Sequence, residues 1–135
     1  MTLAEVEKTY IDDLNMLEDW FLQYEYLLEI SSDLPKFSDQ EKTDANKVKG
    51  CQSGVWLNLS NDDDIVHVQA DSDALIIRGI LAIIVGIFDG QSKTEIDSFE
   101  PSFIEKTNIK NQISTDRFNG INSVISTIKN YAKAI

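Results

Sequence analysis

The sequence VWLNLSNDDDIVHVQA, at positions 55–70, carries the clearest structural pattern in the chain. Apolar residues alternate with polar ones before and after the acidic run at 62–64, which is the period of a strand with one buried face. The two runs predict an antiparallel hairpin joined by a solvated turn. We interpret the acidic run as this turn and not as a calcium loop, because calcium loops space their ligands at alternate positions. A short third strand is expected at residues 47–49.

A buried central helix is predicted directly after the hairpin. Residues 74–88 are almost entirely apolar apart from Arg78, and the short oxygen side chains at 71–73 are typical of a helix start. We expect this helix from about residue 73 to residue 88, with Gly90 as a left-handed cap. A membrane span needs roughly 20 apolar residues, so this segment is interpreted as a core helix.

Helices are also predicted on both sides of this centre. Apolar spacings of three and four over residues 3–30 indicate two amphipathic helices that are broken near Asn15 and followed by a polar connection at 33–46. Ser92 and Glu95 have capping-box spacing, and Pro101 suits the first turn of a further helix.

The last predicted helix begins at 114–116 and contains Gly120. A glycine inside a helix costs about 1 kcal/mol relative to alanine, so we expect Gly120 to be required by close packing. The complete pattern predicts one α+β domain over residues 1–135, with a small three-stranded antiparallel sheet packed against helices.

Composition restricts the function. The 135 residues contain 12 Lys and Arg and 23 Asp and Glu, a net charge of −11, which argues against nucleic-acid and anionic membrane partners. One Cys and one His argue against an intrachain disulfide, a Cys-rich zinc or iron–sulfur site and a His-rich metal site. The first residues are acidic and have no apolar signal segment, so we expect a cytoplasmic protein.

The single cysteine, Cys51, is the main candidate site. A lone Cys is often a buried small hydrophobe, but the Gly and polar residues around Cys51 favour an accessible loop tip. Lys47 and Lys49 lie just upstream and are expected to favour the thiolate. A hydrolase would need His67 as the base, although no orienting carboxylate is evident for it, whereas sulfur exchange needs only an accessible thiol. Arg117 opposes the dipole of the last helix, which fits either a functional role or an ordinary surface ion pair.

The residues around Cys51 resemble a known family. GCQSGVW at 50–56 is similar to the GCQSxVW signature of the SufE family of sulfur-acceptor proteins. Further similar positions occur at matching spacing over nearly the whole chain, with Ser31 and Ile121 as mild departures. These positions are Trp20, residues 24–28 and 34–35, Ser72, Asp73, Ala74, Gly79, Ala82, Arg117, Asn119 and Gly120.

The resemblance implies a fold shared with IscU-type scaffolds and an accessory protein that is not itself an enzyme. In the family, the cysteine that corresponds to Cys51 accepts a persulfide sulfur from a SufS-like cysteine desulfurase, stimulates that enzyme and passes the sulfur to a SufBCD-like iron–sulfur scaffold. Pyridoxal phosphate belongs to the desulfurase, so no cofactor is expected here. The implied loop or partner-binding residues are Gly50, Gln52, Ser53, Trp56, Asp73 and Arg117. Two alternatives stay open, a stand-alone Cys51–His67 hydrolase and a desulfurase adaptor in which Cys51 is only structural.

Overall fold

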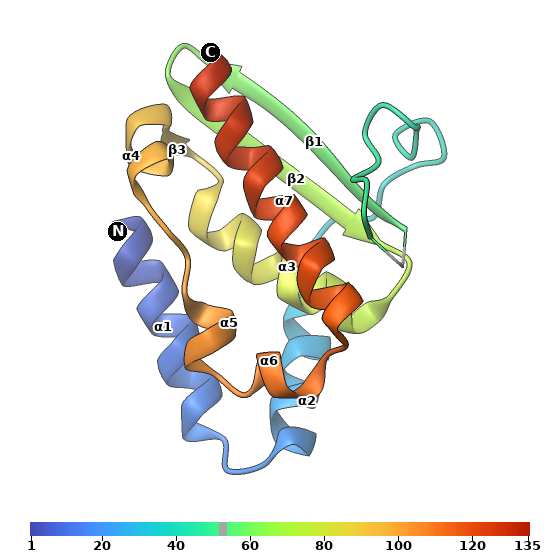
Figure 1. The fold of residues 1–135 in the computed structure, drawn as a ribbon, viewed down its shortest axis with the longest axis vertical. Helices are drawn as coiled ribbons and strands as arrows, with labels where there is room; N and C mark the ends of the chain where they lie inside the picture. The colour runs from blue at the N-terminus through green and yellow to red at the C-terminus, as the bar shows by residue number, and fades with distance from the viewer. Residues whose placement is uncertain (52–53) are drawn as a thin grey trace.

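The computed structural model describes residues 1–51 and 54–135, and these form one α+β domain with a three-stranded antiparallel sheet (Figure 1). The elements in chain order are α1 (Leu3–Met16), α2 (Trp20–Ser31), β1 (Val55–Asp62), β2 (Ile65–Ser72), α3 (Leu75–Phe88), β3 (Gln91–Ser92), α4 (Lys93–Ser98), α5 (Phe103–Lys106), α6 (Ile109–Gln112) and α7 (Thr115–Ala134). The predicted fold class is therefore confirmed.

The hairpin of β1 and β2 forms as the alternation predicts. Its antiparallel register runs from Val55 opposite Ser72 to Asp62 opposite Ile65, and the acidic residues between the strands form the turn. Asp63 adopts a left-handed conformation there, with φ of 50°. This conformation is more accessible to Asp and Asn than to most side chains.

The third strand is not the predicted one. β3 pairs with β2, so the strand order is β1-β2-β3, whereas Lys47 makes only an isolated bridge to Trp56 on the far side of β1. Gly90 explains the return of the chain to β2, because its φ of 79° ends α3 and its N–H donates to the Val66 carbonyl at 2.8 Å. The left-handed cap predicted at Gly90 is thus confirmed.

Helix α3 is the buried centre of the domain, as its apolar sequence predicts, and it contacts α1, α2 and β2. It begins at Leu75, later than expected, because β2 continues through Ser72. The predicted side-chain cap is absent: Ala74 occupies the N-cap position, and the Ser72 hydroxyl donates instead to the carbonyl of Gly54 at 2.8 Å.

A buried ion pair anchors the connection that follows α2. Arg78 Nε lies 2.9 Å from Asp71 Oδ1, and both side chains are more than nine-tenths buried. Arg78 also donates to the Leu34 carbonyl, while the Phe37 N–H donates to Asp71 at 2.9 Å. The pair therefore fixes residues 34–37 against the end of β2 and the first turns of α3.

Helices α4 and α7 start where their capping residues predict. The break after α1 is confirmed near Asn15, and Ser92 and Ser114 accept hydrogen bonds from backbone N–H groups in the first turns of α4 and α7. Pro101 lies just before the N-cap of α5 and not within its first turn. No helix in the described part of the chain is both long and apolar enough to cross a membrane.

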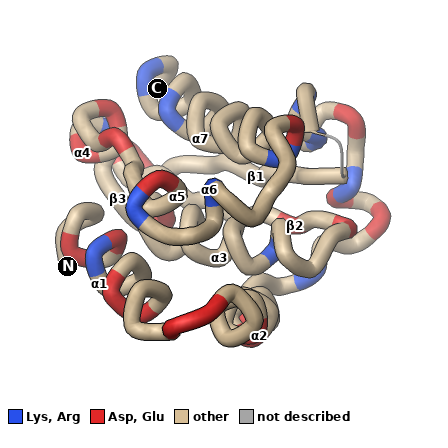
Figure 2. Tube along the Cα trace, turned by 60° about the horizontal axis from the view of Figure 1, so that its bottom comes forward, with Lys and Arg blue, Asp and Glu red and all other residues tan. Residues whose placement is uncertain are grey.

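Helix α7 runs alongside the hairpin, with its first turns near the segment that leads into β1 and its last turns near the hairpin turn (Figure 1). The sheet face that carries Leu57, Val66 and Val68 is buried. Asp and Glu are spread over several elements, among them α1, α2 and α4 (Figure 2).

Candidate functional site

Cys51 lies at the end of the connection that leads into β1, and it packs against the first turns of α7. Its Sγ is 3.6 Å from the carbonyl oxygen of Gly120, with the thiol as donor, and the side chain is partly buried against the core. A Cβ added at Gly120 would lie 3.0 Å from Sγ and 3.4 Å from the Cα of Cys51. The close packing predicted at Gly120 is confirmed, and Cys51 is the residue that requires it.

Burial controls the protonation of this thiol. Removal from water raises the pKa of Cys51 above its ordinary value, because the thiolate loses solvation. Cys51 lies in a loop, as expected, but its side chain is only partly accessible. Its pKa shift is opposite in direction to the one expected from Lys47 and Lys49. At neutral pH the group is a thiol that donates to a helix carbonyl, which keeps it poorly reactive.

Two glycines flank the cysteine. Gly50 has a φ of 85°, a left-handed conformation that other residues rarely adopt. The Gly54 carbonyl accepts from Ser72 Oγ at 2.8 Å and from the Asp73 N–H at 3.1 Å, and a Cβ on Gly54 would lie 2.5 Å from Asp73 Oδ2. The segment that carries Cys51 is thus fixed to the end of the hairpin at Gly54.

Trp56 and Asp73 both lie beside Gly54, where an added Cβ would be 2.5 Å from an atom of each side chain. Trp56 is buried, and Lys42 Nζ lies 5.0 Å from the centroid of its ring and 3.9 Å from Asp73 Oδ1. The Asp73 side chain remains 63% exposed, so it is available to a partner. Sequence reasoning missed Lys42, which lies in the polar connection without any motif to mark it.

Arg117 lies one turn before Gly120 on α7, so the two residues share a face of the helix. Its backbone N–H donates to the Ser114 side chain at 3.2 Å, and among the described residues its guanidinium makes no ion pair. The ordinary ion-pair interpretation is therefore not supported. Gln52 and Ser53, also predicted as site residues, lie outside the described residues.

His67 has the carboxylate neighbours that the sequence did not reveal. Its Nε2 lies 2.9 Å from Asp62 Oδ2, and its Nδ1 lies 3.8 Å from Asp89 Oδ1. Asp62 is the last residue of β1, and Asp89 is the residue directly after α3. The strand pairing of the hairpin and the end of α3 bring these two carboxylates to His67.

The separation of His67 from Cys51 contradicts the hydrolase alternative. His67 pairs with Ser60, five residues along β1 from Val55, which is about 17 Å of strand. Cys51 precedes Val55 at the other end of that strand and is held at Gly120, in the half of α7 remote from the hairpin turn (Figure 1). General-base catalysis needs hydrogen-bond reach, which this arrangement does not provide.

The described residues also contain no group of three or more His, Cys, Asp or Glu side chains that could hold a metal ion.

Comparisons with known proteins address the family directly. The SufE family model, an Fe-S metabolism associated domain, matches residues 8–132. The chain belongs to the SufE family. Two SufE-like relatives extend over the same region: an uncharacterized SufE-like protein of Rhizobium etli is 37% identical over 130 residues, covering 91% of this chain and 86% of that protein. Another from Rhizobium meliloti is 35% identical over 128 residues, covering 91% of each.

A similar fold is found in a solved structure. The solution structure of a hypothetical protein from Thermus thermophilus superposes with a TM-score of 0.74 and covers 99% of this chain and 97% of that one. The sequence identity is 13%, so this likeness supports the fold alone. The fold class predicted from the sequence patterns and the family predicted from the similar positions are therefore confirmed.

Proposed function

We propose that this SufE-family protein is a sulfur acceptor that carries one sulfur atom on Cys51. It takes the sulfur from the persulfide of a cysteine desulfurase, stimulates that enzyme by unloading it, and delivers the sulfur to an iron–sulfur cluster scaffold. The observation that carries the proposal is the position of the only cysteine of the chain, within the GCQSGVW signature and packed on Gly120. One thiol is sufficient to carry sulfur and insufficient to hold a cluster.

The transfer is a thiol–disulfide type exchange and needs no redox partner. The Cys51 thiolate attacks the terminal sulfur of the desulfurase Cys–S–SH group, a new S–S bond forms at Cys51 Sγ, and the S–S bond of the donor breaks. The donor cysteine leaves as a thiolate and takes up the proton that Cys51 released. The same exchange, with Cys51 as the donor, passes the sulfur to a thiol of the scaffold.

In this proposal, the resting position of Cys51 protects its thiol from side reactions. Burial raises the pKa of Cys51 and keeps it protonated, so the free protein reacts slowly with small electrophiles. Attack requires that the thiol breaks its hydrogen bond to the Gly120 carbonyl and loses its proton. In this proposal, both changes occur when the desulfurase docks. A persulfide returned to the same position on α7 would be shielded from free thiols.

The neighbouring residues have supporting roles in this proposal. Gly54, bonded to Ser72 and Asp73, holds one stem of the segment in place while Cys51 moves. Asp73 is exposed, and Arg117 has no ion pair within the described residues, which fits two charges that contact the desulfurase. Gln52 and Ser53 follow Cys51 in the signature, and in this proposal they belong to its loop.

The proposal is tested by desulfurase turnover with cysteine as substrate. Alanine formation should rise when the wild-type protein is added and stay at the basal rate with Cys51→Ser. His67→Ala is the control, and it should stimulate as well as wild type. Stimulation by Cys51→Ser would favour the adaptor alternative, whereas loss of stimulation in His67→Ala would contradict the assignment of the chemistry to Cys51 alone.

A further inference from the structure

β1 has an unpaired stretch of backbone on its outer edge. The Leu57 N–H donates to the Asn46 carbonyl at 2.8 Å, and N-terminal to Asn46 the chain turns away from the strand. Alternate residues of a strand direct their N–H and C=O groups to the same edge, so those of Leu59 and Asn61 point outward like that of Leu57. Among the described residues these outward groups have no hydrogen-bond partner. Such an edge is a template for another strand.

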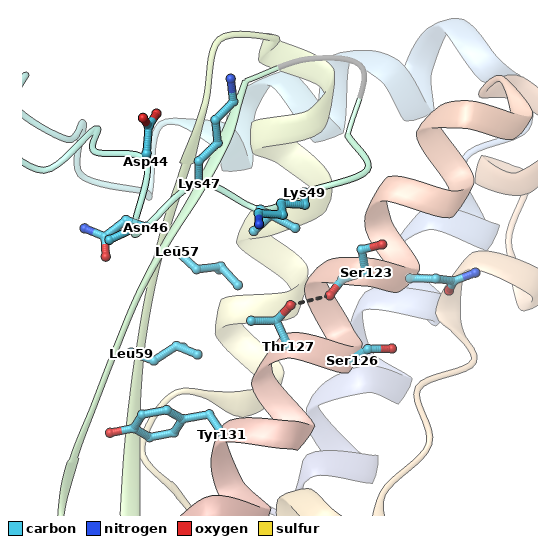
Figure 3. Close-up of a pocket in the computed structure, with 13 residues that line it drawn as sticks. Asp44, Asn46, Lys47, Lys49, Leu57, Leu59, Ser123, Ser126, Thr127 and Tyr131 are labelled. Carbon is cyan, nitrogen blue, oxygen red and sulfur yellow. Dashed lines mark hydrogen bonds between the residues drawn. The ribbon is translucent and has the colours of Figure 1, made fainter.

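A groove of about 810 Å³ lies beside this edge, between β1 and α7 (Figure 3). Leu57 and Leu59 point into it from β1, and the short side chains of Ser123, Ser126 and Thr127 line it on α7. We call this space the β1–α7 groove. One wall of the groove is apolar and the other is polar. Such a groove suits an extended peptide, whose side chains point alternately into the groove and away from it.

The two ends of the groove differ in charge. Lys47 and Lys49 lie at the end of the groove nearer Cys51. Asp44 is the only acidic residue among the described residues that line the groove. The other end is closed by Tyr131, whose hydroxyl donates to Asn61 Oδ1 at 2.6 Å, and it lies next to the acidic turn at 62–64. In a chain with a net charge of −11, two lysines at one end favour an acidic group there.

We propose that the β1–α7 groove binds an extended segment of a protein partner, which adds a strand to the outer edge of β1. The backbone of this segment pairs with Leu59 and Asn61, and its inward side chain is apolar and lies against Leu57 and Leu59. An Asp or Glu of the segment lies at the end of the groove that Lys47 and Lys49 line, away from the acidic turn at 62–64. This binding does not depend on sulfur transfer by Cys51.

The experiment selects binders from a displayed library of random eight-residue peptides against the full chain. Thr127→Trp fills the groove from an exposed position of α7 and is the test variant. Asn130→Trp, also exposed on α7 but outside the groove, adds the same bulk and is the matched control. Synthetic copies of the selected peptides are then titrated against all three proteins, and hydrogen exchange is measured at Leu59 and Asn61.

We expect selected peptides with alternating apolar residues and an acidic residue at one end. Their affinity should fall at least about tenfold with Thr127→Trp, equivalent to about 1.4 kcal/mol, and should not change with Asn130→Trp. Bound peptide should slow exchange of the Leu59 and Asn61 amides. The proposal is overturned if no peptide is selected, if the selected peptides bind Thr127→Trp equally well, or if the free protein is a dimer that Thr127→Trp dissociates, since the groove would then hold a second copy.

Discussion

The contact between Gly120 and Cys51 gives the most direct prediction about the resting state. In Gly120→Ala the new methyl group would lie 3.0 Å from Cys51 Sγ. Carbon and sulfur need about 3.5 to 4.0 Å, so the thiol must move by about 0.5 to 1 Å away from α7. Alanine gains about 1 kcal/mol over glycine inside a helix, and overpacking costs about 1 to 3 kcal/mol. We expect the free energy of unfolding to change by about 1 kcal/mol or less, because Cys51 moves and relieves the overlap.

The displacement should make Cys51 more reactive. Loss of burial lowers the pKa of the thiol toward its ordinary value and opens Sγ to solvent, so alkylation by iodoacetamide at pH 7.5 should be at least about threefold faster than in wild type. Asn130→Ala, at an exposed position of the same helix, is the control and should leave the rate unchanged. An unchanged or slower rate in a folded Gly120→Ala protein would refute the conclusion that this contact shields the thiol.

Two further predictions concern stability. Burial raises the pKa of Cys51 in the folded state, so folding favours the protonated thiol. The contribution of Cys51 to the free energy of unfolding is complete below the pKa of the thiol in the unfolded chain, about 8.5. It is lost as the pH rises through the higher pKa of the folded state. Denaturant unfolding of wild type should therefore lose stability relative to Cys51→Ser between about pH 7 and pH 10, and a constant difference would contradict the burial. Arg78→Met leaves Asp71 buried without its cation and should destabilise the protein by about 3 kcal/mol, whereas Lys8→Met at an exposed pair should cost less than about 1 kcal/mol. Equal costs in the two variants would show that the buried pair does not anchor the connection after α2.

Periodic sequence patterns predicted most of the fold. The hairpin, the central helix and the starts of α4 and α7 follow from alternation, apolar runs and capping side chains, which are local properties. β3 could not be predicted in this way, because a strand of two residues has no period. The missing side-chain cap of α3 has a similar cause: β2 continues through Ser72, so the Ser72 hydroxyl, which donates to Gly54 and accepts from the Ala74 N–H, lies before the N-cap position of the helix.

The candidate site shows the same limit. The motif identified Cys51, and a glycine inside a helix indicated close packing at Gly120, but the contact joins residues that are 69 positions apart. The partial burial of Cys51 depends on that long-range contact, so local composition predicted the loop but not the packing of the thiol against α7. Likewise, the carboxylates around His67 come from the end of β1 and from the residue after α3, and the second of these is not revealed by any local spacing.

Intact-mass spectrometry tests sulfur transfer to Cys51 most directly. The wild-type protein is incubated with a cysteine desulfurase and cysteine, separated without reductant and weighed beside Cys51→Ser treated in the same way. Because Cys51 is the only cysteine of the chain, we predict a single addition of about 32 Da, one sulfur atom, in wild type and none in Cys51→Ser. Wild-type protein without the addition, or an equal addition to Cys51→Ser, would contradict the proposed function.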